Sequence, residues 1–298
     1  MESITRLYTN WSKTYHDEYY GENAPFPPVH KDILIKLLKE AGRKTLLDAG
    51  CGPASFLRYL TEAGIDFYGF DLTPEMVNEA KRELAKRGVS GDKIWVGSVL
   101  DPKSFRPAKI AAPEKFDAVI CSGVMPHIPE ESDVAVIENL CNATKANGIV
   151  VLEARNAFFS LFTLNRYSCE FFLDSLVRIS EIKDKVKEES AGLEKAIEEL
   201  KGQFRMDLPP VRAGDNENPG YDNVLSRTHN PMILERQFKT AGLEDVRLQL
   251  YHYHCLPPML ERYAPDLFKR ESLAMENPDD WRGIFMASAF FVVGKKRD

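Results

Sequence analysis

Two glycines and two aspartates form the most informative group of residues in the sequence. Gly50 and Gly52 follow a short apolar run, and Asp48 stands just before them. Asp71 ends the next apolar run, about twenty residues further on. Glycines let the backbone approach a ligand closely, and an acidic residue at such a strand end accepts hydrogen bonds from ribose hydroxyls. The spacing therefore predicts a turn that binds a nucleoside.

Two classes of nucleoside ligand fit this turn, namely dinucleotides and S-adenosylmethionine. Asp48 separates them, because a carboxylate repels a pyrophosphate but attracts an ammonium or sulfonium group. Two unit charges about 4 Å apart interact by ~4 kcal/mol at an effective dielectric constant of ~20. The third glycine of the dinucleotide fingerprint is also absent, since Ser55 stands in its place. Both observations favour S-adenosylmethionine.

The elements that must position these residues alternate between strand and helix. Apolar runs predict strands at 45–50, 66–71, 93–99, 116–123, 148–154, 246–254 and 287–296. Helical spacing predicts helices at 31–41, 55–63, 73–88, 131–148 and 231–243. The alternation predicts a Rossmann-like α/β fold, with a seven-stranded, mostly parallel sheet and helices on both faces.

The expected chain organisation has three parts. Residues 1–30 form an N-terminal aromatic lid segment, and residues 31–156 together with 229–298 form the binding core. Residues 157–228 are first aromatic, then highly charged, then rich in turn residues. We expect them to form a mainly helical insertion, or lid, that covers the acceptor site.

Four segments resemble the signature motifs of the class I S-adenosylmethionine-dependent methyltransferases. They are LLDAGCGPA, FYGFDLTPEM, FDAVICSGVMPHIPEE and ANGIVVLEARN, in the family's order and at the expected strand ends. The resemblance covers roughly residues 40–156 and the final helix and strands, but not the insertion. It implies an enzyme of the small-molecule methyltransferase type, with S-adenosylmethionine as cofactor and S-adenosylhomocysteine as product.

The resemblance also implies a role for each matching residue. Gly50 and Gly52 would line the cofactor, Asp48 would face its methionine portion, and Asp71 would hold the ribose hydroxyls. The other implied cofactor contacts are Leu72, Ser98 and Val99 at the adenine, Ser122 at the methionine moiety, and Tyr15 and Tyr19 in an aromatic segment over the cofactor. An aromatic helix packed on the core is the alternative for the two tyrosines.

Candidates for catalysis and acceptor binding follow the later strands. His127 comes after the fourth strand and is the candidate general base, with a structural hydrogen bond as the alternative. Arg155 and Asn156 follow the fifth strand, where open α/β sheets place ligands. With Tyr167 of the insertion they are the expected acceptor contacts, and a purely structural loop is the alternative.

The composition limits the partners. The formal net charge of −6 disfavours nucleic acid and anionic membranes. No run approaches the ~20 apolar residues of a membrane helix, and the N-terminus lacks the pattern of a secretory signal. The five cysteines form no C-x-x-C pair, so we expect no metal site and a cytoplasmic location.

These observations predict methyl transfer to a hydroxyl or amine of a small molecule, such as a metabolite, a sugar or a secondary-metabolite precursor. The partner is then a small-molecule acceptor, without nucleic acid or membrane, and a homodimer is compatible with the sequence. The alternatives are a non-catalytic S-adenosylmethionine-binding subunit, a nicotinamide-dependent oxidoreductase, and a methyltransferase acting on protein or RNA.

Overall fold

A single sheet organises the chain in the computed structural model, which describes residues 2–21, 24, 26–40, 42–106, 111–185, 190–208, 214, 219–220 and 223–298. The strand order is β3-β2-β1-β4-β5-β7-β6. The strands are β1 Thr45–Ala49, β2 Asp66–Asp71, β3 Ile94–Val96, β4 Phe116–Cys121, β5 Thr144–Arg155, β6 Leu243–Tyr253 and β7 Ala287–Lys296. Strands β1 to β5 pair in parallel, and β7 runs antiparallel to β5. The expected seven-stranded, mostly parallel sheet is confirmed.

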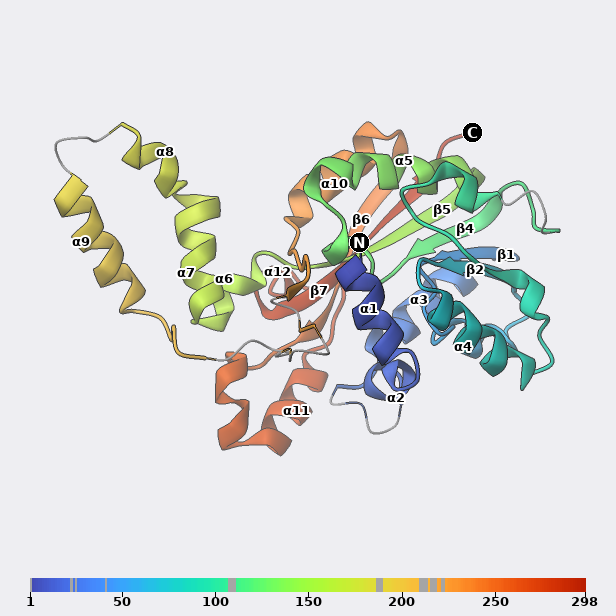
Figure 1. The fold of residues 1–298 in the computed structure, drawn as a ribbon, viewed down its shortest axis with the longest axis horizontal. Helices are drawn as coiled ribbons and strands as arrows, with labels where there is room; N and C mark the ends of the chain where they lie inside the picture. The colour runs from blue at the N-terminus through green and yellow to red at the C-terminus, as the bar shows by residue number, and fades with distance from the viewer. Residues whose placement is uncertain are drawn as a thin grey trace. The chain divides into compact units, whose positions relative to one another are not determined.

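Helices cover both faces of this sheet. They are α3 Val29–Glu40, α4 Pro74–Ala85, α5 Asp133–Ala143 and α10 Pro231–Thr240, and two further helices, α1 Glu2–Trp11 and α2 Tyr15–Tyr19, precede them in the chain. From β1 the chain first builds outward through β2 and β3, and then in the other direction through β4 and β5. Right-handed crossovers therefore place α4 and α5 on opposite faces. Figure 1 shows α3 and α4 on one side of the strands, with α5 and α10 on the other.

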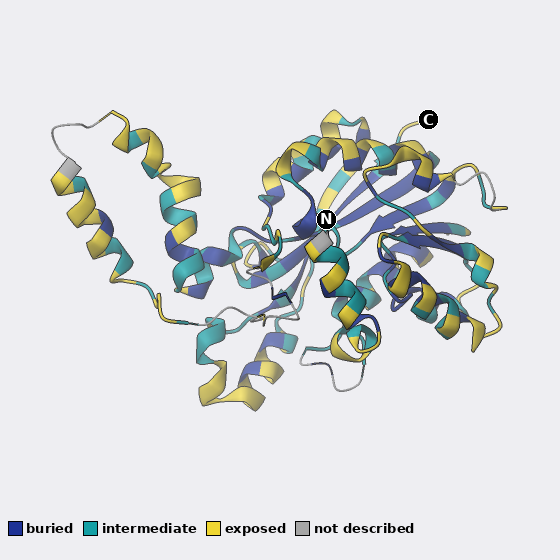
Figure 2. Ribbon diagram, in the orientation of Figure 1, coloured by how far each residue is buried: buried dark blue, intermediate teal, exposed yellow. Residues whose placement is uncertain are grey.

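The central strands of the sheet are buried between the helices, as Figure 2 shows. Leu46 and Leu47 of β1 are fully buried, because helices cover both faces of a parallel sheet. The strand order reverses between β1 and β4, and open α/β sheets bind ligands at the carboxyl ends of the strands beside such a reversal.

Two expected helices differ from the structure. Residues 55–63 form only a short 3₁₀ helix, Leu57–Leu60, among turns. The amides of Tyr59 and Ala63 donate to the carbonyls three residues earlier, those of Phe56 and Leu60, both at 3.0 Å, which is the hydrogen-bond pattern of a 3₁₀ helix or turn. The helix expected at 131–148 ends at Ala143, because Thr144 is already extended and its hydroxyl donates a hydrogen bond to the Leu140 carbonyl at 2.7 Å.

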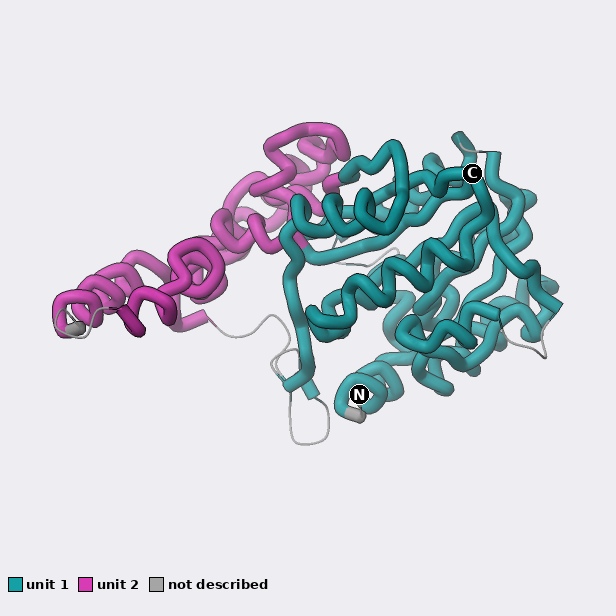
Figure 3. The backbone as a smooth tube through the Cα atoms, turned by 90° about the horizontal axis from the view of Figure 1, so that it is seen from above, with its two compact units in different colours: residues 1–155, 212–249, 289–298 teal, residues 156–211, 250–288 magenta. Residues whose placement is uncertain are grey.

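The chain divides into two compact units, shown in Figure 3. Unit 1 comprises residues 1–155, 212–249 and 289–298, and unit 2 comprises 156–211 and 250–288. Unit 2 thus combines most of the expected insertion with a later segment, whereas residues 212–228 group with unit 1. Its elements are α6 Phe159–Thr163, α7 Arg166–Glu170, the π-helical turn Phe171–Leu176, α8 Ile179–Lys183, α9 Ser190–Lys201, the 3₁₀ helix Pro258–Tyr263, α11 Pro265–Ala274 and α12 Gly283–Met286. That the insertion covers an acceptor site stays a prediction.

Candidate functional site

The glycine turn after β1 is held in one conformation by β2. Gly50 and Gly52 have φ values of 97° and 51°, which favour glycine. A Cβ on Gly50 would lie 2.2 Å from Cγ2 of Val124, so the backbone approaches the end of β4 too closely for a side chain. The amides of Gly50 and Cys51 both donate to the Phe70 carbonyl, at 2.8 and 2.9 Å. The turn is therefore fixed by β2 and by its close approach to Val124, and Gly50 and Gly52 remain half-buried.

Asp71 connects this turn to the start of α4. One carboxylate oxygen accepts a hydrogen bond from the Gly52 amide, and the other accepts one from the Thr73 amide, both at 2.9 Å. Each carboxylate oxygen has a further lone pair, so the group can still accept hydrogen bonds from a pair of hydroxyls. Burial raises the pKa of Asp71, and the backbone hydrogen bonds oppose that rise. Leu72 beside it is 38% exposed and offers an apolar surface.

A small cavity of about 40 Å³ lies at the reversal of strand order. Its lining residues are Tyr15, Tyr20, Asp48, Gly50, Cys51, Gly52, Ser55, Phe56, Ile120 and Ser122. Ser55 is 2% exposed, and its hydroxyl has no hydrogen-bond partner among the described residues. An unpartnered buried hydroxyl costs ~1–3 kcal/mol, which a polar ligand group in this cavity would relieve. This hydroxyl, the glycine turn and the nearby carboxylates fit a cationic nucleoside such as S-adenosylmethionine.

Asp48 carries the clearest electrostatic signature in the cavity. Burial raises its pKa to about 7, and the carboxylates of Asp71 and Glu153 add to the rise. Glu153 accepts a hydrogen bond from the Ser122 hydroxyl, at the adjoining ends of β5 and β4. Sequence reasoning missed Glu153, although it stands inside the motif that includes β5. Its place at the carboxyl end of a strand was the available signal.

Aromatic side chains in and just after α2 line the cavity. Tyr15 and Tyr20 line it, and burial raises the pKa of both phenols well above the usual value, so both are neutral donors at neutral pH. Tyr19 does not line the cavity but stacks on Tyr15 with ring centroids 4.8 Å apart. Sequence reasoning missed Tyr20. A cofactor contact by Tyr15 or Tyr19 stays a prediction.

The residues expected at the adenine lie beyond the end of β3. The Ser98 hydroxyl accepts a hydrogen bond from the Leu100 amide at 3.2 Å. Val99 is buried, and its carbonyl accepts a hydrogen bond from Asn139 at 2.9 Å. Neither Ser98 nor Val99 lines the cavity, so their contact with adenine stays a prediction.

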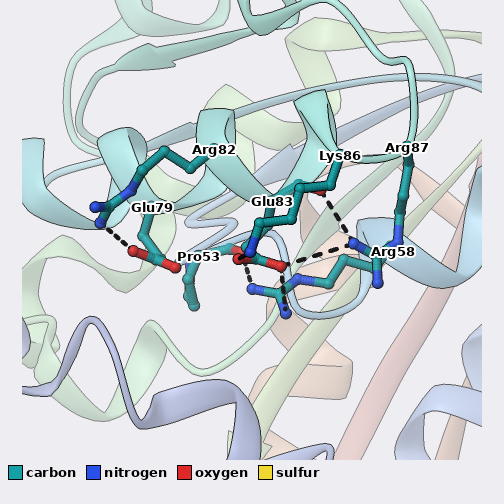
Figure 4. A network of polar contacts seen from close by, with 7 residues as sticks. All are labelled: Pro53, Arg58, Glu79, Arg82, Glu83, Lys86 and Arg87. Atoms are coloured by element: carbon teal, nitrogen blue, oxygen red, sulfur yellow. Dashed lines mark hydrogen bonds and ion pairs between the residues drawn. The ribbon is translucent and has the colours of Figure 1, made fainter.

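An ion-pair network supports the glycine turn from α4 (Figure 4). Arg58 donates to the Pro53 carbonyl at 3.0 Å and lies 3.5 Å from a carboxylate oxygen of Glu83. Glu83 also pairs with Lys86 and Arg87 of the same helix region. Because the Arg58 and Glu83 side chains are mostly buried, this pairing is stronger than a typical exposed ion pair and holds the turn against α4.

Both ring nitrogens of His127 are engaged within unit 1. Nδ1 lies 2.7 Å from the Leu225 carbonyl, and Nε2 lies 2.8 Å from the Tyr8 hydroxyl. A carbonyl only accepts, so Nδ1 carries the hydrogen and Nε2 of the neutral ring accepts from Tyr8. Burial lowers the pKa of His127 to about 4. The Tyr8 hydroxyl therefore occupies the position next to Nε2 that a methyl-acceptor substrate would need. The sequence did not reveal this contact.

Residues 225–229 lie beside the ends of β4 and β5 and carry a second cluster of hydrogen-bonded polar side chains. One nitrogen of Arg227 donates to both carboxylate oxygens of Asp133, at 2.8 and 2.9 Å, and lies 2.8 Å from Nε2 of His229. Arg155 donates to the Ser226 hydroxyl at 2.5 Å. These residues secure the segment that carries the Leu225 carbonyl, and only Arg155 among them was a sequence candidate.

The other two acceptor candidates lie in unit 2. Asn156 is 1% exposed, and its amide nitrogen donates to the carbonyls of Ile284 and Ala287 at 2.8 and 2.9 Å. The Tyr167 hydroxyl accepts a hydrogen bond from Arg166 at 2.9 Å. Asn156 thus has a structural position inside unit 2, and contact of either residue with an acceptor stays a prediction.

Within the described part of the chain, no three His, Cys, Asp or Glu side chains cluster as a metal site would require. Nor does any helix there have the length and apolar character needed to cross a membrane.

Comparisons with known proteins agree on one family. Residues 40–207 match the family described as a methyltransferase domain. A ubiquinone biosynthesis O-methyltransferase of Actinobacillus pleuropneumoniae (serotype 5b, strain L20) is 23% identical over 164 residues, which are 53% of this chain and 68% of that protein. The protein of the same name from Nitrosomonas europaea is 25% identical over 174 residues, 56% of this chain and 62% of that one. The matches thus span about two thirds of the length of these relatives.

A solved structure supports the fold. An O-methyltransferase family protein from Burkholderia thailandensis aligns with a TM-score of 0.53 at 12% identity, over 100% of this chain and 63% of that chain. The family match covers more than half of the sequence and includes the glycine turn, Asp71 and both neighbouring strand ends. The chain therefore belongs to the class I S-adenosylmethionine-dependent methyltransferases.

Proposed function

We propose that this protein methylates a hydroxyl or amine of a small molecule. The observation that carries the proposal is the cavity beside the glycine turn, where Asp48 and an unpartnered buried Ser55 hydroxyl face the same space. The names of the similar proteins, O-methyltransferases of ubiquinone biosynthesis, support a small organic acceptor. The net charge of −6 supports an acceptor other than nucleic acid.

In this proposal the residues of unit 1 bind and orient the cofactor. S-adenosylmethionine, when bound, supplies an electrophilic methyl group on a sulfonium. Asp71 and the backbone of the glycine turn hold the nucleoside, and Tyr15 and Tyr20 cover the cavity against water. Such positioning lowers a two-reactant barrier by ~7–11 kcal/mol.

The proposed proton acceptor is His127, acting through Tyr8. A hydroxyl or amine acceptor must lose a proton, and a positioned base contributes ~10²–10⁴-fold. The proton moves to the Tyr8 oxygen while the Tyr8 hydroxyl proton moves to Nε2 of His127. The ring is neutral at neutral pH, because burial holds its pKa at about 4. Arg155, Asn156 and Tyr167 remain proposed acceptor contacts, and a homodimer remains compatible with the chain.

The first test is calorimetric binding of S-adenosylhomocysteine to the wild type and to Asp71→Ala. Removing a charged group that accepts two hydroxyl hydrogen bonds should weaken binding by ~2–4 kcal/mol, or roughly 30- to 800-fold in affinity. Asp66→Ala is the matched control, because Asp66 begins the same strand and pairs with Lys93 at its opposite end. A wild type that binds no S-adenosylhomocysteine contradicts the proposal.

The acceptor class needs a separate measurement. The protein is incubated with methyl-labelled S-adenosylmethionine and a cell extract, and the products are separated by size. We expect the label among small molecules. Label in protein or RNA contradicts a small-molecule acceptor, and no transfer to any fraction favours a non-catalytic binding subunit.

A further inference from the structure

The ends of β1, β4 and β5 bring two carboxylates to either side of one serine. Asp48 of β1 pairs in register with Ile120 of β4, and Cys121 pairs with Leu152 of β5. Ser122 follows β4 directly, and Glu153 is the residue of β5 next to Leu152, two residues before that strand ends. The Ser122 hydroxyl lines the cavity with Asp48 and donates a hydrogen bond to Glu153. Glu153 is therefore connected to the cavity through one side chain.

The charge around this cavity is strongly one-sided. None of the described residues that line it is a lysine or an arginine. Asp71 and Glu153 both act on Asp48 and raise its pKa, and Glu153 also raises the pKa of Tyr15 and Tyr20. Carboxylates in a buried setting interact through a low effective dielectric constant, so their field is weakly screened. The cavity consequently favours a ligand that carries a positive charge.

Ser55 points to a ligand independently of the carboxylates. Its hydroxyl is buried, comes from the loop after the glycine turn, and has no hydrogen-bond partner among the residues that the structure describes. The cavity therefore combines nearby carboxylates with a buried Ser55 hydroxyl that a polar group of a ligand could hydrogen-bond.

On the basis of the proposed function, we propose that Glu153 belongs to the cofactor site and, with Asp48, makes this site prefer cationic S-adenosylmethionine over its neutral product. Methyl transfer converts the sulfonium into a thioether and so removes one positive charge from the ligand. The carboxylates stabilise the sulfonium of the bound donor, and this interaction is lost when methyl transfer leaves a neutral thioether. The product then leaves more readily than the donor.

The test compares ligands that differ in charge at one position. S-adenosylmethionine, S-adenosylhomocysteine and the cationic amine analogue sinefungin are titrated by calorimetry into the wild type and Glu153→Gln. A pH of about 8.5 keeps Asp48 ionised in both proteins. We expect Glu153→Gln to weaken the two cationic ligands ~3- to 30-fold and S-adenosylhomocysteine less than about twofold.

Two further variants separate charge from structure. Glu153→Asp retains the carboxylate and is expected to retain the wild-type ratio of affinities for S-adenosylmethionine and its product. Glu138→Gln removes an exposed carboxylate of α5 and is expected to change no affinity. Equal weakening of all three ligands by Glu153→Gln, or no weakening, overturns the inference.

The wild type alone also tests it, should Glu153→Gln fail to fold. We expect S-adenosylmethionine and sinefungin to bind more tightly than S-adenosylhomocysteine. The reverse order overturns the preference for the cationic ligand while leaving the proposed function intact. A wild type that binds none of the three overturns both.

Discussion

The cavity beside the glycine turn and the surroundings of His127 lie at neighbouring strand ends but treat their polar atoms differently. In the cavity, the Ser55 hydroxyl is buried without a partner in the described part of the chain, and the pKa of Asp48 is raised to about 7. At His127, both ring nitrogens find partners in the chain itself, Tyr8 and the Leu225 carbonyl.

The two regions therefore differ in hydrogen bonding: the cavity has a polar group that a ligand could satisfy, whereas the ring nitrogens of His127 are already hydrogen-bonded within the protein. A buried group without a partner destabilises the free protein, so a ligand that hydrogen-bonded to Ser55, as we propose, would recover free energy. His127 has no such deficit, and its hydrogen bonds stabilise the free protein. Its proposed part in catalysis therefore depends on Tyr8 passing on a proton without breaking the hydrogen bond to Leu225.

The largest effect is expected for Gly50→Ala. The added Cβ meets Val124 at 2.2 Å and the backbone has φ 97°, so we expect a loss of ~2–4 kcal/mol in the free energy of unfolding and much weaker S-adenosylhomocysteine binding. Urea denaturation and calorimetry measure the two. Gly42→Ala is the control, because Gly42 also has a positive φ, 58°, but open space around its Cβ. Equal losses in both variants would show that the close approach to Val124 is unimportant.

His127→Ala tests the second region. It removes two hydrogen bonds and leaves the Leu225 carbonyl without its donor, so we expect ~1–3 kcal/mol less stability in urea denaturation. The affinity for S-adenosylhomocysteine should change less than about twofold, because His127 does not line the cavity. With an acceptor in hand, an unchanged turnover number across pH would rule out His127 as the base.

The pH dependence of cofactor binding tests the protonation of Asp48. Its pKa of about 7 lies above the ordinary value of 3.8, so the folded protein holds a proton that the unfolded chain releases. The contribution of Asp48 to stability therefore falls as pH rises from about 4 to about 7.

A cationic ligand favours the carboxylate, so S-adenosylmethionine affinity should rise up to about tenfold between pH ~6 and ~8, with release of a proton. Calorimetry in buffers of different ionisation enthalpy detects that proton. The release should disappear in Asp48→Asn. Proton uptake by the wild type would contradict the assignment.

Ser55→Ala has the smallest expected effect and sharpens the comparison most. Removing a buried hydroxyl without a partner should leave the stability unchanged or raise it by up to about 1 kcal/mol, whereas S-adenosylhomocysteine affinity should fall ~3- to 10-fold. Ser168→Ala is a contrasting control, because the buried Ser168 hydroxyl is hydrogen-bonded to the Ser160 carbonyl and its loss should cost stability. Unchanged affinity in Ser55→Ala would mean that the ligand does not use this hydroxyl.

Local patterns in the sequence were enough for the sheet, the glycine turn and the two aspartates. A buried parallel strand is a short apolar run, and the turn needs glycines at defined positions, so both can be recognised without knowing their neighbours. The positions of Asp48 and Asp71 can be predicted from the same apolar runs, because both residues stand near the carboxyl end of a predicted strand. The family resemblance rests on these segments for that reason.

Tertiary structure decided what surrounds those residues. Tyr8 meets His127 across 119 residues of chain, and Ser122 meets Glu153 across 31. Residues 55–63 form turns and a short 3₁₀ helix, although their side chains have helical spacing. Hydrogen bonds of this kind depend on which strand ends and loops pack together, and a single sequence carries no local signal for such pairings. The sequence alone therefore determined where the glycine turn lies, and packing between distant segments decided which side chains complete the cavity beside it.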